Sequence, residues 1–317
     1  MEYYYLTHYE SDTYPFLIRY LNKEGLHTRY LHAPTSHGEY VNGLLAAWRA
    51  VAIAEHGTII TYLSSVGVLC WWVSLLRHKK VKIVATNLAL KDDSSQRTRL
   101  MGFLYRHALR SKRFTLTVTS RKYGQAMQLR LHHSQPFHLL RDYNQYPGYV
   151  RAYSDNGKRI FCGGNTQRDW ARCLRLAELM PDWIFMLVGY DSDSNMSVPK
   201  NVKIYRRLSF AYFIQALSQS TFVYLPTKWN CPAGLTVLMH ATWNGRVVAV
   251  SANDVTEEYV TPDRGIISND CEQVARQMRS LYANPDCCQS MVAAMQHFLT
   301  EECSAEAYCK SMESILT

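Results

Sequence analysis

Two glycine-containing turns in the second half of the chain have the residue types needed to hold an anion. In the first, a strand-like run over residues 159–164 ends in Gly163-Gly164, followed by Asn165 and Arg168. A glycine pair lets the backbone come close to a ligand, and the N–H groups that open the next helix attract negative charge. Arg168 adds a fixed positive charge. An ordinary tight turn with a surface arginine is the alternative interpretation of this stretch.

The second turn follows another strand-like run, over residues 221–226, and leads into an apolar helix. The candidate site residues in it are Lys228, Asn230, Gly234, Leu235 and Thr236. Backbone N–H groups at the helix start and the hydroxyl of Thr236 can surround a phosphate. An N-capped core helix is the alternative. Two such helix starts at the carboxyl edge of one sheet are harder to explain without a ligand than one.

The elements that must position these turns alternate between strand and helix along the whole chain. Strands are expected near residues 3–9, 27–33, 58–63, 81–86, 114–120, 136–140, 159–164, 183–189, 201–207, 221–226, 246–251 and 265–269. Helices are expected near residues 14–25, 43–55, 64–77, 94–111, 121–131, 169–180, 210–218, 235–243, 271–283, 286–299 and 304–316. Such alternation favours α/β layers with parallel sheets. We predict two Rossmann-like domains, residues 1–147 and 148–303, whose sheets face each other across a crevice, and a last helix, 304–317, that can cross back to the first domain.

Positive charge is concentrated in the first half of the chain. The net charge is +9, and residues 1–150 hold 19 Lys/Arg against 9 Asp/Glu. Arg99, Arg106, Arg110 and Arg113 are spaced by seven, four and three, so we expect them to share one helix face. We predict that this half contacts an anionic membrane surface. A nucleic-acid-binding protein is a distant alternative, because the recognition motifs of such modules are absent.

Apolar runs, the N-terminus, the cysteines and an Asp-x-Asp indicate the cellular compartment and whether a metal is bound. Hydrophobic residues make up 47% of the chain, yet no apolar run reaches the length of a spanning helix. The N-terminus lacks the features of a signal peptide. The nine cysteines include no CxxC pair, and residues 191–193 carry an Asp-x-Asp in a polar loop rather than at a strand end. We therefore expect a cytoplasmic protein on the inner face of the membrane, with no metal and no tightly bound cofactor.

An ordered series of blocks in the second half carries a resemblance. The blocks are GGNTQRDW, LAELMPDWIFMLVG, NVKIYRRLSFAYFIQALSQSTFVYLPT, GLTVLMHATWNGRVVAVSANDVTEEYV and GIISNDCEQVARQMRSLYANPD. This half resembles the nucleotide-sugar domain of GT-B glycosyltransferases of the large retaining group called family 4. The first half matches only in its pattern of elements. The resemblance implies a GT-B fold and metal-independent transfer of a sugar from a UDP- or GDP-sugar.

The resemblance also assigns roles to residues. Arg168 and Lys228 stand where positive residues offset the leaving diphosphate, and Asn230 and His240 stand where relatives carry two glutamates. Asn230 would then contact the donor sugar, and His240 the ribose. The implied catalytic set is Arg168, Lys228 and Asn230. The implied donor-binding set is Gly163, Gly164, Asn165, Leu208, Gly234, Leu235, Thr236 and His240.

Function follows from these assignments. The leading hypothesis is a retaining glycosyltransferase that moves a sugar from a nucleoside-diphosphate sugar to a glycan or lipid-linked acceptor, in bacterial polysaccharide or lipopolysaccharide biosynthesis. The missing glutamates leave a non-catalytic donor-binding or scaffold subunit as the alternative. No nucleic acid is expected as a partner.

Overall fold

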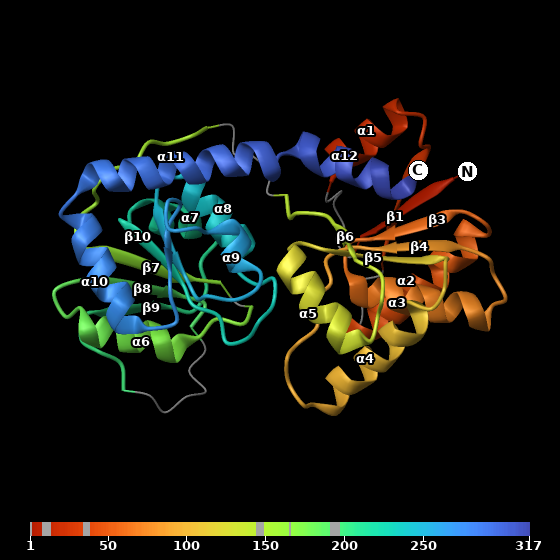
Figure 1. Ribbon diagram of the computed structural model, residues 1–317, viewed down its shortest axis with the longest axis horizontal. Helices are drawn as coiled ribbons and strands as arrows, with labels where there is room; N and C mark the ends of the chain where they lie inside the picture. The colour runs from red at the N-terminus through yellow and green to blue at the C-terminus, as the bar shows by residue number, and fades with distance from the viewer. Residues whose placement is uncertain (1, 8–13, 34–38, 144–148, 165, 191–196) are drawn as a thin grey trace. The chain divides into compact units, whose positions relative to one another are not determined.

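The chain divides into two compact units, each with its own sheet. A computed structural model describes residues 2–7, 14–33, 39–143, 149–164, 166–190 and 197–317. Unit 1 comprises Met1–Tyr143 and Ala305–Thr317, and unit 2 comprises Asn144–Ser304. The last helix, α12 (Ala305–Leu316), therefore belongs to the same unit as the N-terminus (Figure 1).

Unit 1 is built on a six-stranded parallel sheet with the order β2-β1-β3-β4-β5-β6. Its strands are β1 (Tyr3–Thr7), β2 (Thr28–His32), β3 (Thr58–Thr61), β4 (Lys82–Ala85), β5 (Phe114–Val118) and β6 (His138–Leu139). The helices besides α12 are α1 (Pro15–Lys23), α2 (Glu39–Ala54), α3 (Ser64–Leu76), α4 (Gln96–Ala108) and α5 (Arg121–Leu131). Figure 1 shows α1 and α12 on one side of this sheet and α2 and α3 on the other.

Aromatic side chains fasten α12 to unit 1. Tyr308 of α12 stacks on Tyr14 with ring centroids 5.3 Å apart, and Tyr14 in turn meets the edge of Tyr5 in β1 at 6.0 Å. All three rings are buried. Because these residues come from opposite ends of the chain, the core of unit 1 closes only when α12 docks.

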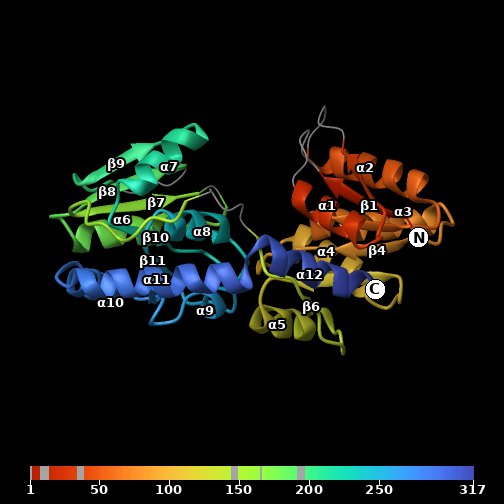
Figure 2. The ribbon, with the colours of Figure 1, turned by 90° about the horizontal axis from the view of Figure 1, so that it is seen from above.

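Unit 2 repeats the same architecture, with the strand order β12-β11-β10-β7-β8-β9 and parallel pairing throughout. Its strands are β7 (Arg159–Gly163), β8 (Ile184–Val188), β9 (Val202–Tyr205), β10 (Phe222–Leu225), β11 (Val247–Val250) and β12 (Ile266–Ile267). Its helices are α6 (Trp170–Leu179), α7 (Phe210–Ser218), α8 (Leu235–Trp243), α9 (Thr256–Tyr259), α10 (Cys271–Tyr282) and α11 (Pro285–Glu302). Figure 2 shows β9 at one edge of the sheet. Strands β10 and β11 are buried along their whole length, as expected for the centre of a parallel sheet covered on both faces.

The predicted alternation is confirmed, with two differences. The short helix α9 was not expected, because a single turn carries no periodic apolar signal. Helix α4 ends at Ala108 rather than near residue 111, and a turn follows in which the N–H of Arg110 bonds the carbonyl of His107. Arg110 and Arg113 therefore lie beyond the helix, and the prediction that four arginines share its face is wrong for these two.

Candidate functional site

Arg168 joins the carboxyl ends of two strands of unit 2. Its side chain is buried, with 3% of its surface exposed. Nε and Nη2 donate to the carbonyl oxygen of Gly163, at 3.1 and 2.8 Å, and Nη1 donates to that of Pro226 at 3.1 Å. Burial lowers the pKa of Arg168, but a guanidinium keeps its proton in proteins. A fixed positive charge therefore lies where β7 and β10 end.

Gly164 and Gly234 approach this guanidinium from different loops. Both have positive φ, +112° and +88°. A Cβ on Gly164 would lie 3.1 Å from Nη2 of Arg168, and one on Gly234 would lie 3.2 Å from the same atom. Any other residue at either position would be strained and would crowd the guanidinium. The two glycines thus keep space open beside a buried charge.

The start of α8, together with Gly164 and Gly234, borders the space beside Arg168, which is called the cradle below. Gly234 is the N-cap and offers no side chain to the first-turn N–H groups, which leaves them available to an anion. Leu235 is buried and anchors the helix start, whereas Thr236 is exposed. Two backbone hydrogen bonds join the loops, from Lys228 N to Gln167 O and from Asp169 N to Pro226 O, each 3.0 Å long. Of the predicted anion-site residues in the first turn, Asn165 lies outside the described residues.

The two remaining predicted donor-binding residues, His240 and Leu208, come from different segments of unit 2. His240 is half-buried on α8, and its ring meets that of Phe210 at 5.3 Å. Partial burial lowers the pKa of His240, so the imidazole is neutral at pH 7 and one ring nitrogen can accept a hydrogen bond. Leu208 is half-buried in the segment between β9 and α7. Sequence reasoning missed Phe210, whose ring is 67% exposed at the start of α7.

A polar pocket of about 360 Å³ opens beside the same loops. Lys228, which is exposed, and Asn230 both line it. The side-chain amide of Asn230 donates to the carboxylate of Asp254, and its Oδ1 accepts from the N–H of Asp254 at 3.1 Å. Asn230 is therefore held in one orientation by Asp254, a residue that the sequence did not single out because it lies 24 positions away.

Arg172 contributes a second charge to the polar pocket. Its Nη1 donates to Oδ1 of Asn269 at 2.8 Å and to Oγ of Ser251 at 3.1 Å. Hydroxyl, amide, carboxylate and cationic groups thus surround one space at the carboxyl ends of β10, β11 and β12. Such a lining suits a ligand with many hydroxyl groups, because each hydroxyl both donates and accepts.

In the parts of the chain that the structure describes, no group of three or more His, Cys, Asp or Glu is placed to hold a metal ion. The Asp-x-Asp of residues 191–193 lies outside those parts. Within the same described residues, no helix has the length and apolar character needed to cross a bilayer.

Solved structures of low sequence identity share the fold. Sucrose-phosphate synthase from Thermosynechococcus elongatus aligns with a TM-score of 0.76 and 14% identity, over 99% of this chain and 98% of that one. Anabaena Alr3699/HepE, solved with UDP-glucose, aligns with a TM-score of 0.70 and 12% identity, over 99% of both chains. A glycosyltransferase from Rickettsia africae aligns with a TM-score of 0.66 and 11% identity, over 99% and 98% of the two chains.

These alignments span both units of the chain. Together with the two six-stranded parallel sheets, they show that the protein has the GT-B fold, of two Rossmann-like domains. No protein-family model matches the sequence, and no curated protein matches it. The fold was therefore predicted correctly from an ordered series of short blocks, while function has to be argued from the site.

Proposed function

We propose that the protein is a glycosyltransferase that takes a sugar from a nucleoside-diphosphate sugar. The observation that carries this proposal is the convergence of Gly164, Gly234 and the start of α8 on the guanidinium of Arg168. The arrangement offers backbone N–H groups, a helix dipole and a fixed charge to one diphosphate. The binding of UDP-glucose by the structurally similar HepE supports this choice of ligand.

We propose a role for each part of the site. The diphosphate would lie at the glycines, the sugar toward Asn230, and the ribose near His240. When the bond between the anomeric carbon and the phosphate oxygen breaks, the electron pair goes to the diphosphate. Arg168 and Lys228 would stabilise that charge without a metal ion.

We further propose retention of the anomeric configuration, as in family 4. We also propose that unit 1 binds a glycan or lipid-linked acceptor, in bacterial polysaccharide or lipopolysaccharide biosynthesis.

Thermal unfolding with nucleotide sugars tests donor binding. A ligand that binds only the folded protein raises the midpoint by mass action, so UDP-, GDP-, ADP- and CMP-sugars can be compared directly. We expect UDP- or GDP-sugars to raise it more than the others. If none of the four raises the midpoint, the donor-binding assignment is wrong.

The alternative function is a donor-binding subunit without catalysis. Asn230 favours it, because an amide cannot act as the acid, base or nucleophile that a glutamate provides. Release of free sugar from the donor that stabilises the protein separates the two functions. Slow hydrolysis of the donor supports the transferase. Donor binding without turnover, whichever acceptor is added, supports the scaffold.

We also propose that unit 1 attaches the protein to the cytoplasmic face of an anionic membrane. The basic excess of residues 1–150 supports this, and so do the exposed side chains of Leu100 and Phe103 on α4, at 59% and 44%. Trp71, by contrast, is buried against its neighbour Trp72, so it cannot serve as an interfacial anchor. Lower binding to anionic vesicles at high salt would support the attachment.

A further inference from the structure

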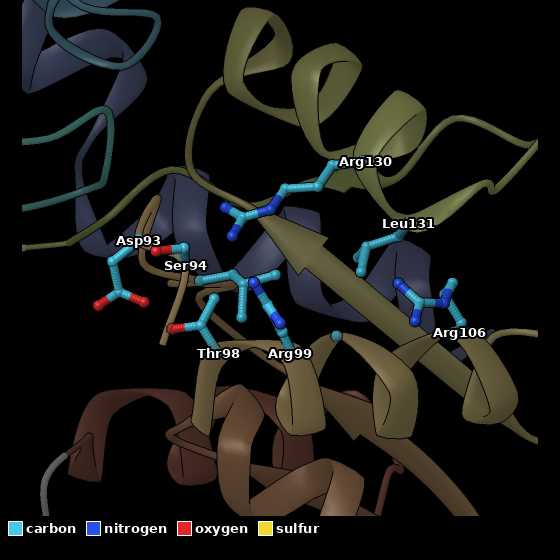
Figure 3. Close-up of a pocket in the computed structure, with 9 residues that line it drawn as sticks. Asp93, Ser94, Thr98, Arg99, Arg106, Arg130 and Leu131 are labelled. Atoms are coloured by element: carbon cyan, nitrogen blue, oxygen red, sulfur yellow. The ribbon is translucent and has the colours of Figure 1, made fainter. Parts of the chain in front are cut away.

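Three arginine side chains converge on a pocket of unit 1 that the proposed donor site does not use. Arg99 and Arg106 rise from α4, and Arg130 descends from α5 toward them (Figure 3). The pocket has a volume of about 360 Å³, which exceeds the space that a single water or chloride needs. Three cations around one cavity repel one another, so the arrangement calls for an anion.

The acidic groups nearby neutralise only part of this charge. Nη1 of Arg130 lies 3.6 Å from Oδ1 of Asp92, and its Nη2 donates to the carbonyl of Lys91 at 2.6 Å. That Nη1 is buried and makes no hydrogen bond with the described residues. Asp93 also lines the pocket, and its carboxylate, which accepts from N and Oγ of Ser95 at 3.2 and 2.7 Å, stays ionised, so two carboxylates oppose three guanidinium groups.

The other two arginines are free to bind. Arg99 is exposed and Arg106 is half-buried. Neither guanidinium has a hydrogen bond or ion pair with the described part of the chain. Planar guanidinium groups match the oxygens of a phosphate, and each pair of N–H groups can hold two of them.

An apolar groove lies next to the arginine pocket. Leu90 and Thr98 line both cavities, so the two adjoin at α4. The groove has a volume of about 660 Å³ and is lined mainly by apolar side chains of α2, α3 and α4. Leu44 and Leu100 line it and remain 51% and 59% exposed. A soluble phosphate would satisfy the arginines but would leave this apolar surface in water.

We propose that the arginine pocket binds the phosphate of an anionic lipid and that the groove holds part of its hydrocarbon chain. A ligand with a phosphate at one end and an apolar chain at the other matches both cavities at once. This site goes beyond the general attraction of a basic surface to a membrane, because it depends on particular residues. It does not depend on donor binding by unit 2.

Co-sedimentation of the full-length chain with vesicles tests the pocket. Phosphatidylcholine vesicles with and without phosphatidylglycerol serve as probes. The double variant Arg99→Gln/Arg106→Gln is compared with Arg110→Gln/Lys112→Gln, which removes two exposed charges of the same sign that line neither cavity. We expect the pocket variant to bind phosphatidylglycerol vesicles about tenfold more weakly than the control variant. Equal losses in the two variants would overturn the pocket and leave only surface electrostatics.

A second pair of variants tests the groove. Leu100→Ser removes an exposed leucine of the groove, and Leu129→Ser removes an 80% exposed leucine of α5 outside it. Only Leu100→Ser is expected to weaken binding to phosphatidylglycerol vesicles. Glycerol phosphate and inorganic phosphate are added as soluble competitors. If they displace the protein fully and Leu100→Ser binds normally, the site takes a soluble phosphate and the lipid assignment is wrong.

Thermal unfolding of each variant confirms that it is folded, and nucleotide-sugar binding separates the two proposals. If the chain binds the lipid but no nucleotide sugar, the proposed function is wrong and the lipid site stands. If the chain binds the nucleotide sugar but Arg99→Gln/Arg106→Gln leaves vesicle binding unchanged, the proposed function stands and the lipid site is wrong.

Discussion

The carbonyl oxygen of Gly163 accepts two hydrogen bonds from Arg168, from Nε at 3.1 Å and from Nη2 at 2.8 Å. A third bond from the same guanidinium reaches the carbonyl of Pro226. Arg168 is therefore both a positive charge beside the proposed diphosphate and a brace between the ends of two strands. Its replacement must affect stability as well as activity.

Arg168→Ala is expected to lower the free energy of unfolding by about 3 kcal/mol, because the carbonyl of Gly163 loses two hydrogen bonds and that of Pro226 keeps only the bond from the N–H of Asp169. Arg168→Lys should recover little, since one ammonium cannot reproduce the planar arrangement of three bonds. Urea unfolding measures both changes. Wild-type stability in Arg168→Ala would show that these bonds do not brace the loops.

Lys228→Ala separates charge from stability, because this side chain is exposed. We expect turnover to fall on the order of 10²–10³ with stability unchanged, as for loss of one donor to a developing oxyanion. Lys203→Ala, which removes an exposed lysine of the edge strand β9, is the control. Similar turnover in both variants would remove Lys228 from the catalytic set.

Gly234→Ala should abolish donor binding, because the new Cβ would lie 3.2 Å from Nη2 of Arg168 and would fill the cradle. Gly157→Ala is a matched control: its φ is also positive, +75°, but no atom lies within 4 Å of the added Cβ. Both changes cost about 1 kcal/mol or more in backbone strain. Nucleotide-induced stabilisation should be lost only in Gly234→Ala, and its persistence there would place the diphosphate elsewhere.

His240→Glu is expected to retain nucleotide binding, since a carboxylate can accept a hydrogen bond from the same ribose hydroxyl. His240→Leu should weaken binding, because leucine offers no polar atom. Titration with the nucleotide that stabilises the wild type measures both. Unchanged affinity in His240→Leu would make His240 a packing residue against Phe210.

We expect Asp142 to give unit 1 a pH-dependent stability. Burial raises the pKa of Asp142 to about 6, above its usual value of 3.8. The folded protein then holds a proton that the unfolded chain has already lost, so stability is greatest below the lower pKa and falls as the pH rises through the higher one. Tyr14 and Tyr308 face this carboxyl, and burial raises their own pKa values, so both stay neutral in this range.

The expected loss is up to about 3 kcal/mol between pH 4 and pH 7. Asp142→Asn should remove this component and be more stable than the wild type at neutral pH. Urea unfolding of both proteins across the range provides the comparison. Parallel stability curves for the two would show that Asp142 does not titrate in this way.

The sequence by itself determined the architecture and pointed to the two loops at which we propose an anion site. Apolar runs such as residues 222–225 and 247–250 can be satisfied only inside a parallel sheet, because they lack a polar face. Gly164 and Gly234 marked two loops at which the backbone must turn with positive φ. These signals are local, so a single sequence displays them.

Only the tertiary structure decided how the side chains are used. The sequence left open whether Arg168 is a surface charge or part of an anion site, and in the structure it is buried because its partners are carbonyls at the ends of two strands. Asn230 is oriented by Asp254, which belongs to a different loop. The arginine pocket likewise unites Arg99 and Arg130, which lie on separate helices. Contacts between segments distant in sequence leave no local pattern, and the packing of the sheets and helices alone brings them together.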